Sequence, residues 1–545
     1  MRFGRTGILF LCVLPAWASA THVVTTLADS GAGSLRDAMT QANGSSGDTI
    51  NFAHGLTGTI LLQSPLPNVI AYMIINGPGP TALNINGQGR YQCFSVLQEL
   101  DLSGVTVENC GSNMTATYVS PSGTLKLVNT NMNYNTTSGL GGAILNDGNL
   151  TLADVSFSLN SARLAGGALY NRGYATLSNV AFNGNSASAG GAIGNESSLT
   201  MSFGTLAGNT SRNGDGGGAV FNSNPGELSI DRSSFINNSS IQGFYGGGVI
   251  LNQAGLTLLN ATFWLNAADN NGGAIYNSGV LYAGYVTIAN NSAPGGGLYN
   301  TQTFKMGSSI VARGSSGPNC NGTFSFSSEG YNLTDDSSCN FTGPGDINNT
   351  GASLDPNGPQ LNGGITPTIA LLPNSLAVNR IPPSLSCGTG VTDQRNVPRP
   401  QGSGCDIGAF ELGAFEHFTA KLELITGLLG RFNLASTFTL GSGFDVLDPP
   451  DQALTLRIGT YQVNLPAGSL RPIGSGVWVF AGVVNGTALG IQVQLLGGGD
   501  SETVGPYQLT AQGAPANFFG VVSPTILSLT IGPYSGTITP FTPAI

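Results

Sequence analysis

The sequence predicts an all-β protein built mainly as a parallel β-helix, a solenoid in which short strands wind into stacked coils. Three observations predict it: two phrases recur about every two dozen residues over 141–300, each copy holds short apolar runs, and the chain contains 81 Gly in 545 residues. A period of this length indicates a repeat architecture. Apolar runs of three to five residues broken by Gly and Asn are too short for stable helices and suit short strands.

The first phrase has the form Gly-Gly-x-x-x-Asn and occurs seven times, at intervals of 23 to 30 residues. Its asparagines are Asn146, Asn171, Asn195, Asn222, Asn252, Asn277 and Asn300. The second phrase alternates with the first and consists of a large apolar residue followed by x-x-Asn. Its aromatic members are Phe157, Phe182, Phe235 and Phe263. Stacked coils place equivalent residues of successive repeats directly above one another.

Both phrases are interpreted as architecture rather than as catalytic signatures. Paired glycines reach backbone angles that side chains forbid, so they turn the chain tightly between sheets. The repeated Asn is expected in a left-handed bend, with its copies hydrogen-bonded as a ladder. The repeated Phe is expected to stack inside the core. With the solenoid placed at 49–312, we expect on the order of eleven coils and a rod of roughly 50 Å.

The first 20 residues have the pattern of a secretory signal peptide. Arg2 and Arg5 precede the apolar run 8–14, and Ala18-Ser19-Ala20 is a small-residue cleavage site. We therefore expect a secreted or cell-surface protein with no transmembrane segment in its mature part. A monomer is also expected. The net charge of −10 argues against nucleic acid and anionic membranes as partners.

Six cysteines follow the signal sequence, and they fall into three neighbouring pairs. An even number in an exported chain predicts disulfides. Sequence alone permits 15 pairings. The local pairing is favoured, namely Cys93 with Cys110, Cys320 with Cys339, and Cys387 with Cys405.

The alternating GGA(I/L/V) and F-x-x-N phrases over 130–300 resemble the repeats of the polymorphic outer membrane protein family. That resemblance implies a right-handed parallel β-helix with an adhesive, surface-displayed role. The family ends in a membrane-embedded barrel of well over two hundred residues. Here the segment after the repeats is shorter and ends in FTPAI without a terminal aromatic, so an autotransporter is not expected.

Residues 21–48 are predicted to form a helical cap over the first coil, because an open end of a solenoid exposes a sheet edge. Ser34 is the expected N-cap, with Asp37 three residues later. Leu35, Ala38, Met39 and Ala42 then form one apolar stripe. The S-L-R-D-A phrase followed by D-T-I-N-F resembles the start of many secreted bacterial β-helix proteins.

Residues 313–415 are predicted to cap the other end. The phrases GYNLTDDSSCNF, LDPNGPQLNGGITP and TDQRNVPRPQGSGCDIGAFE over 329–411 resemble the choice-of-anchor Q domain, which follows the repeats of secreted β-helix proteins. The densest charge of the chain lies here, and internal pairing is the favoured interpretation over a binding site. Its members are Asp393, Arg395, Arg399, Asp406 and Glu411. No cofactor is expected; the alternative is calcium on the hard oxygen ligands of Asp335, Asp336, Asp346 and Asp355.

Residues 416–545 are predicted to form an antiparallel β-sandwich, because short alternating runs recur there and Asn485-Gly486 suits a type I′ hairpin turn. No catalytic motif is evident, and its ligand is not readable. The sequence favours a non-catalytic adhesin or scaffold whose partner is an extracellular polysaccharide or a surface protein. The alternative is a polysaccharide lyase or glycoside hydrolase, which generally needs carboxylates flanking the scissile bond. The acids over 130–300 are scattered, with no stacked pair: Asp147, Asp154, Glu196, Asp215, Glu227, Asp231 and Asp269.

Overall fold

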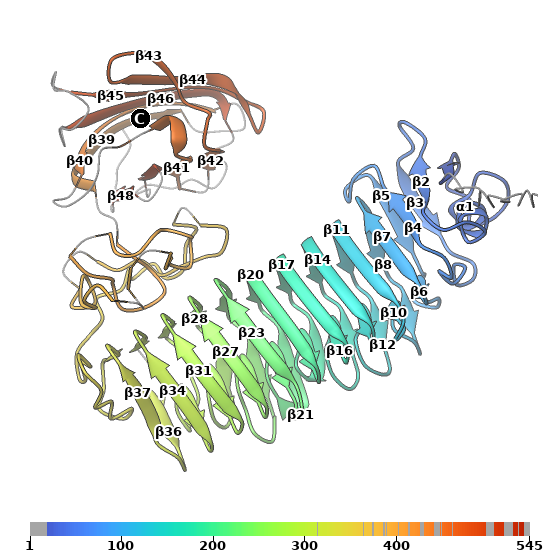
Figure 1. The fold of residues 1–545 in the computed structure, drawn as a ribbon, viewed down its shortest axis with the longest axis horizontal. Helices are drawn as coiled ribbons and strands as arrows, with labels where there is room; N and C mark the ends of the chain where they lie inside the picture. Colours follow the sequence, from blue (N-terminus) through green and yellow to red (C-terminus); the bar gives the residue numbers. More distant parts are fainter. Residues whose placement is uncertain are drawn as a thin grey trace, which may run out of the picture.

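The computed structural model describes residues 19–538, with gaps at 313, 315, 363, 373–374, 385–386, 389, 402, 413–414, 426–429, 441–446, 448, 460, 497–505, 517–526 and 532–533. The predicted signal peptide therefore lies almost wholly outside the described residues. The described chain is all-β apart from short helical pieces, and it contains a parallel solenoid followed by antiparallel sheets (Figure 1). No helix among the described residues has the length and apolar character to cross a membrane.

The parallel solenoid has about 12 turns, close to the expected eleven. Parallel pairing begins with β1 (Thr21–Val24) on β2 (Asp48–Phe52) and ends with β38 (Leu333–Thr334) on β35 (Ile310–Ala312). The ladder thus extends on both sides of the predicted range 49–312. Val24 is fully buried in the hydrophobic core that runs through the solenoid, which explains why the first strand belongs to the stack. The handedness of the coils stays a prediction.

Three stacks of strands run along the solenoid. The largest sheet has 21 strands. These are β1 (Thr21–Val24), β2 (Asp48–Phe52), β3 (Gly58–Leu61), β4 (Met73–Asn76), β5 (Leu83–Asn86), β7 (Glu99–Ser103), β8 (Thr106–Glu108), β11 (Thr124–Asn133), β14 (Asn149–Ser158), β17 (Tyr174–Asn183), β20 (Ser198–Ala207), β23 (Glu227–Asp231), β24 (Ser234–Ile236), β27 (Gly255–Leu259), β28 (Thr262–Trp264), β31 (Val280–Gly284), β32 (Thr287–Ala289), β34 (Thr303–Gly307), β35 (Ile310–Ala312), β37 (Phe326–Gly330) and β38 (Leu333–Thr334).

The second and third sheets have ten and seven strands. The ten are β6 (Phe94–Val96), β10 (Thr117–Val119), β13 (Ile144–Asn146), β16 (Leu169–Asn171), β19 (Ile193–Asn195), β22 (Val220–Asn222), β26 (Ile250–Asn252), β30 (Ile275–Asn277), β33 (Leu298–Asn300) and β36 (Cys320–Gly322). The seven are β9 (Gly111–Ser112), β12 (Thr136–Thr137), β15 (Ser161–Ala162), β18 (Ser186–Ala189), β21 (Thr210–Gly216), β25 (Ser239–Ile241) and β29 (Ala267–Ala268).

The repeated asparagines form two buried ladders. In the Gly-Gly phrase, Asn146 Nδ2 donates to Asn171 Oδ1 at 2.7 Å, and the same bond recurs coil by coil to Asn300. In the second phrase, Asn135 Nδ2 donates to Asn160 Oδ1 at 3.0 Å, and this ladder continues to Asn291. The predicted ladder is confirmed, and a buried amide that bonds to the next coil avoids the cost of an unpaired polar group.

The expected left-handed bend at the asparagine is wrong. Asn146 is the last residue of strand β13 and has extended backbone. The side-chain amides of the equivalent asparagines therefore keep the same orientation from coil to coil. The bends lie nearby instead, at Leu159, which directly precedes Asn160 and has φ +57°, and at Asp154, which has φ +57° and turns the long strand β14. The expected aromatic stack is present, since the rings of Phe157 and Phe182 lie parallel with centroids 4.7 Å apart. A second pair, Phe235 and Phe263, has centroids 4.6 Å apart.

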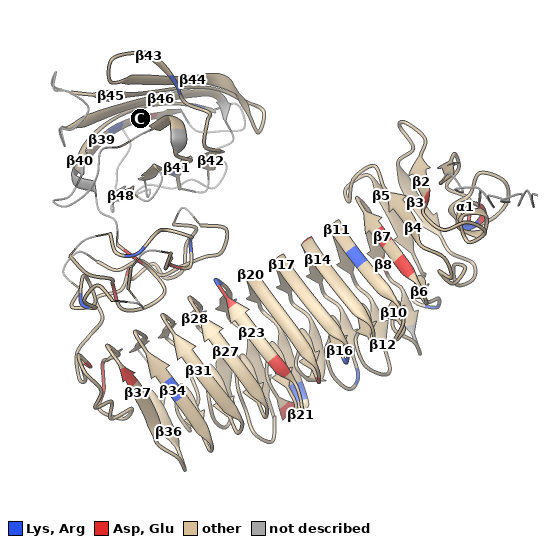
Figure 2. Ribbon diagram, viewed as in Figure 1, with Lys and Arg blue, Asp and Glu red and all other residues tan. Residues whose placement is uncertain are grey.

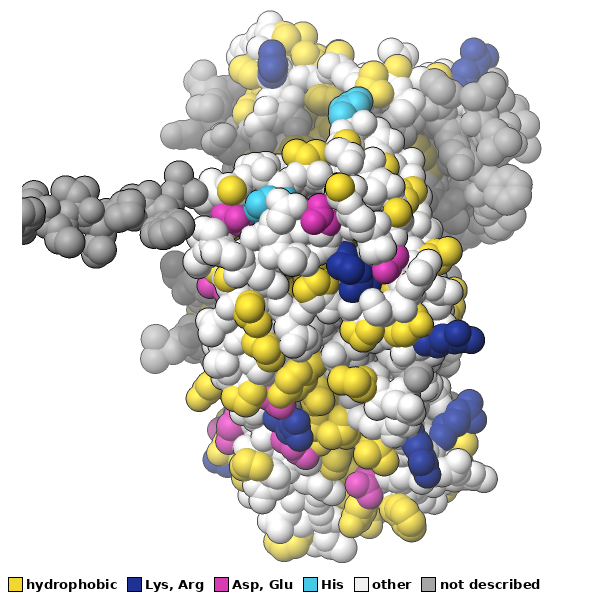
Figure 3. All heavy atoms as spheres, turned by 90° about the vertical axis from the view of Figure 1, so that its right-hand side faces the viewer, with side chains coloured by type: hydrophobic (Ala, Val, Ile, Leu, Met, Phe, Trp, Pro, Cys, Tyr) yellow, Lys and Arg dark blue, Asp and Glu magenta, His cyan; other side chains and the backbone are white. Residues whose placement is uncertain are grey.

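The helix α1 (Leu35–Ala42) lies at the N-terminal end of the solenoid (Figure 1). The side chain of Ser34 accepts a hydrogen bond from the backbone N–H of Asp37 at 3.2 Å, as predicted for an N-cap. All four residues of the expected apolar stripe are buried in the common core. The predicted helical cap is thus present only as this one short helix. Figure 3 looks onto this end, where apolar side chains emerge in small patches among polar atoms.

The segment after the last coil first closes the core and then folds back along the solenoid. Cys320 and Cys339 are joined, and Phe341 belongs with them to the solenoid core. Later residues form a second cluster with the outer side of the final coils, including Trp264, Tyr285 and Ile310. The segment predicted as an end cap therefore also covers a flank. The other two predicted disulfides, Cys93–Cys110 and Cys387–Cys405, are present too.

The C-terminal region consists of two antiparallel sheets whose buried side chains form one cluster. The six-stranded sheet holds β39 (Phe415–Ile425), β40 (Gly430–Leu440), β43 (Arg471–Gly474), β44 (Val477–Val484), β45 (Thr487–Leu495) and β46 (Tyr507–Ala516). The four-stranded sheet holds β41 (Leu454–Ile458), β42 (Tyr461–Leu465), β47 (Leu527–Ile531) and β48 (Tyr534–Ile538). Asn485 and Gly486 join β44 to β45, both with positive φ, as a type I′ turn requires.

Candidate functional site

The predicted charge cluster is assembled in the returning segment, and it is buried. Asp393 Oδ2 accepts from Arg395 Nε at 2.9 Å and from Nη2 at 2.8 Å. Asp393 Oδ1 also accepts from the backbone N–H of Val397 at 2.9 Å. The guanidinium of Arg395 lies 3.7 Å above the ring of Phe410. A buried charge-assisted pair of this kind, with the second carboxylate oxygen bonded to the backbone, fixes the loop that carries it.

The second half of the cluster joins Arg399 to Glu411. Arg399 Nη1 donates to Glu411 Oε2 at 2.6 Å and to the carbonyl of Asp406 at 2.9 Å, while Nη2 donates to the carbonyl of Gly408 at 2.7 Å. The same guanidinium lies 4.3 Å above the ring of Tyr285 on the solenoid. Asp406 accepts from the backbone N–H groups of Asn379 and Leu412, at 2.6 and 2.5 Å.

Burial shifts the titration of the two carboxyls that lie deepest. Burial first, and then the charge of Glu411, raises the pKa of Asp406 to about 8. Burial also raises the pKa of Glu411, against the favourable charge of Arg399. Perturbed carboxyls are found at catalytic sites and in structural ion-pair networks alike. Here the polar contacts run to the loops' own backbone, which supports the interpretation of internal pairing.

The contact between the returning segment and the solenoid was not predicted from the sequence. Gln394 Nε2 donates to Ser234 Oγ at 2.8 Å, and Thr262 Oγ1 donates to Gln394 Oε1 at 2.7 Å. The backbone N–H of Ala409 donates to Thr287 Oγ1 at 3.0 Å. Trp264 packs here with 8% of its surface exposed. The returning segment therefore contacts several successive coils.

A sequence signal for this contact exists in the second phrase. The residue after the core Phe points outward, and it is polar in earlier coils, as in Ser158 and Asn183. In later coils it is Ile236, Trp264 and Ala289. A change from polar to apolar at one repeat position marks a flank that another part of the chain covers.

The acids of the solenoid are dispersed along it, as Figure 2 shows. Asp147 forms an ion pair with Arg172 at 2.7 Å and accepts from the hydroxyl of Tyr118. The hydroxyl of Tyr170 donates to Glu196, and Asp154 accepts from Asn179 at 2.6 Å. These contacts join each acid to a neighbouring coil.

The four acids considered for calcium accept hydrogen bonds from their own surroundings. Asp346 accepts from Ser328 Oγ and the backbone N–H groups of Gly343 and Asn332, all within 2.7 Å. Asp335 accepts from Asn319 Nδ2 at 2.6 Å. Across the described residues, no three His, Cys, Asp or Glu side chains are grouped to hold a metal ion. Calcium stays a prediction.

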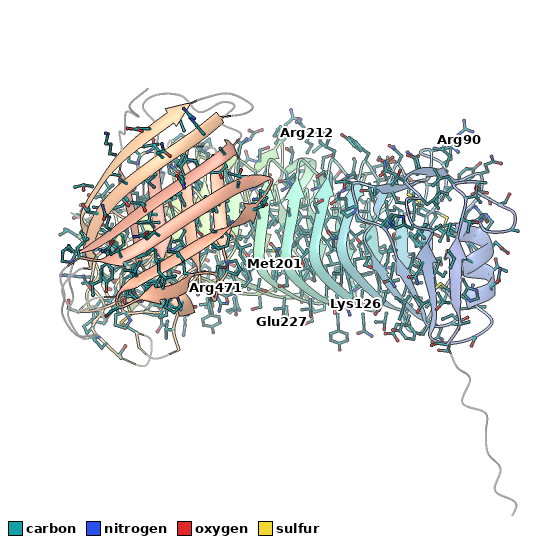
Figure 4. All side chains as sticks on the ribbon, turned by 90° about the horizontal axis from the view of Figure 1, so that it is seen from above. Arg90, Lys126, Met201, Arg212, Glu227 and Arg471 are labelled. Atoms are coloured by element: carbon teal, nitrogen blue, oxygen red, sulfur yellow. A yellow bond between two sulfur atoms is a disulfide. The ribbon has the colours of Figure 1, made fainter. Side chains whose placement is uncertain are left out.

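A hollow lies on the outer face of the six-stranded sheet, which the sequence analysis missed. It comprises two overlapping parts of about 580 and 570 Å³, and both are lined by Asn433, Gln512, Gly490 and Ala481. These four residues pair in register across β40, β46, β45 and β44. Figure 4 shows the strands of this sheet side by side from above. No amino-acid motif signals the hollow, because it depends on which strands become neighbours.

No protein family, curated protein or solved structure matches the chain in comparisons with known proteins.

Proposed function

We propose that this protein is an exported, non-catalytic adhesin or scaffold, in which a rigid solenoid carries a C-terminal β-sandwich module. The observation that carries the proposal is where the repeated residues lie and what they contact. The asparagines of both phrases are buried and bonded to the next coil, and the phenylalanines stack in the core. The repeats thus contribute to the stiffness and length of a rod.

Export is supported by the signal-peptide pattern at residues 1–20 and by three disulfides, which persist in oxidising environments. The resemblances to polymorphic outer membrane protein repeats and to the choice-of-anchor Q domain also favour a surface role. In this proposal α1 caps the first coil, and the returning segment protects the last ones. The partner is an extracellular polysaccharide or a surface protein.

The test uses the mature chain from Thr21 with its disulfides formed. It is incubated with plant, algal and bacterial polysaccharides, with and without calcium, while new reducing ends and unsaturated products are assayed. Retention on the polymers and on intact cells is measured in parallel, with the reduced and denatured chain as control. Retention without turnover supports the proposal. Turnover of any polymer contradicts it and favours a lyase or hydrolase, and a chain that adheres to no polymer or cell contradicts the adhesive role.

A further inference from the structure

We infer that the hollow on the outer face of the six-stranded sheet binds a neutral polysaccharide chain. The inference rests on the proposed non-catalytic role and names the surface that makes contact. All lining residues come from β40, β44, β45 and β46, and those of them that are exposed, such as Asn433, Gln512 and Ala481, place the hollow on the face turned away from the sandwich core. The hollow is shallow and open, which suits a chain laid across the sheet rather than an enclosed small molecule.

The floor of the hollow is a glycine that the fold does not require. Gly490 lies inside β45, between Gln512 on one side and Ala481 on the other. A Cβ placed there would meet its nearest atoms, in the side chain of Gln512, at an ordinary 3.6 Å. Its φ is outside the left-handed region. Glycine weakens a strand interior, and one use of it there is to let a ligand approach the backbone closely.

The side chains around Gly490 can form hydrogen bonds with the hydroxyl groups of a sugar. Asn433, Gln512 and Thr510 are exposed, and Gln492 Nε2 donates to Gln494 Oε1 at 3.3 Å, which orients the neighbouring amides. An amide offers donors and an acceptor together, and a sugar hydroxyl both donates and accepts. Apart from Arg431 at one end, the lining is uncharged, so amide and hydroxyl groups supply most of its polar contacts.

The position on a sheet face selects a polysaccharide over a peptide. An extended peptide binds by adding a strand to a sheet edge, where backbone groups are free. In the hollow, the backbones of β46 and β45 are already paired on both sides. Ligands must therefore be held by side chains. The row from Asn433 to Ala481 spans three inter-strand spacings, about 14 Å, which suits several sugar rings in a line.

The test measures retention of the mature chain from Thr21 in native gels that contain starch, dextran, xyloglucan or galactomannan, with polygalacturonate and alginate as anionic counterparts. We expect retention by at least one neutral polymer and by neither anionic one. Gly490→Val fills the floor, so we expect at least a tenfold loss of affinity together with an unchanged or higher melting temperature. Asn433→Ala and Gln512→Ala should each weaken binding about tenfold, the value of one or two lost hydrogen bonds.

Asn464→Ala is the matched control, because Asn464 is an exposed amide on the four-stranded sheet. It should bind as the unaltered chain does. The inference is overturned if no neutral polymer retains the protein, or if Gly490→Val binds as tightly as the unaltered chain. In the second case adhesion stands and only its location is wrong. Cleavage of the polymer instead contradicts the proposed function, whatever Gly490→Val does.

Discussion

Gln394 donates a hydrogen bond from Nε2 to Oγ of Ser234 at 2.8 Å, across 160 residues of chain. The same amide also donates to Thr366 Oγ1 at 3.0 Å and accepts from Thr262. All of these atoms are buried. One side chain thus connects the returning segment to two coils of the solenoid.

Replacing Gln394 with Ala should destabilise the contact of the returning segment with the solenoid by about 2–3 kcal/mol, because the buried hydroxyl of Thr262 loses its acceptor and those of Ser234 and Thr366 each lose a donor. Chemical denaturation followed by tryptophan fluorescence measures the loss, since Trp264 lies in the same interface. Gln401→Ala is the control, because its side chain makes one exposed bond to the carbonyl of Pro398. Equal stability of the two variants would contradict a connecting role for Gln394.

Replacing Asn195 with Ala should interrupt the ladder in the middle of the solenoid. Asn171 Nδ2 then loses an acceptor and Asn222 Oδ1 loses a donor, so we expect a loss of about 2–4 kcal/mol from unsatisfied buried groups. Urea denaturation measures it. Asn183→Ala serves as control, because Asn183 is exposed on the same coil stack and should cost less than about 0.5 kcal/mol.

Truncating Trp264 to Ala should cost about 3–5 kcal/mol, as for other large core aromatics. Gly358, whose φ is +75°, packs directly on the indole, so the returning loop loses an aromatic surface on which it rests. Hydrogen exchange should rise over 350–411 before it rises in the early coils. Unchanged exchange in that segment would show that it is held independently of Trp264. Tyr174→Ala, an exposed aromatic on an earlier coil, is the comparison.

Stability should fall as pH rises from about 4 to 8. The pKa of Asp406 is raised to about 8 by burial, whereas an unfolded Asp titrates near its ordinary value. The folded state therefore holds the extra proton between these values, and its contribution is lost as pH passes the folded pKa. The slope for one such proton is about 1.4 kcal/mol per pH unit. In urea denaturation at each pH, Asp406→Asn should flatten the dependence of stability on pH, and Asp355→Asn should not. Stability that rises with pH over this range would contradict the raised pKa of Asp406.

The periodicity of the sequence was enough to predict the solenoid, both ladder positions and the aromatic stack. Equivalent residues in a β-helix lie directly above one another, so a local phrase determines a long-range contact. The three disulfides were predicted for a similar reason, because each joins cysteines that are near in sequence.

Features that depend on contacts between segments far apart in the sequence were not predictable in the same way. The position of Asn146 in extended backbone follows from the register of neighbouring coils, not from its preference for bends. The docking of Gln394 joins residues with no shared motif. The row from Asn433 to Ala481 exists only once four strands have paired. In each case the determining information lies in tertiary pairing.

The returning segment also changes how the rod responds to force. In an ordinary solenoid each coil contacts its neighbours alone, so pulling on the C-terminal end peels coils off one at a time. Here the carbonyl of Arg232 accepts from the hydroxyl of Thr366, and the carbonyl of Ser308 accepts from the N–H of Gly408, so the segment is bonded to coils that lie several repeats apart. Tension applied through the sandwich module therefore loads several coils in parallel. The rod should yield in one large step at that end.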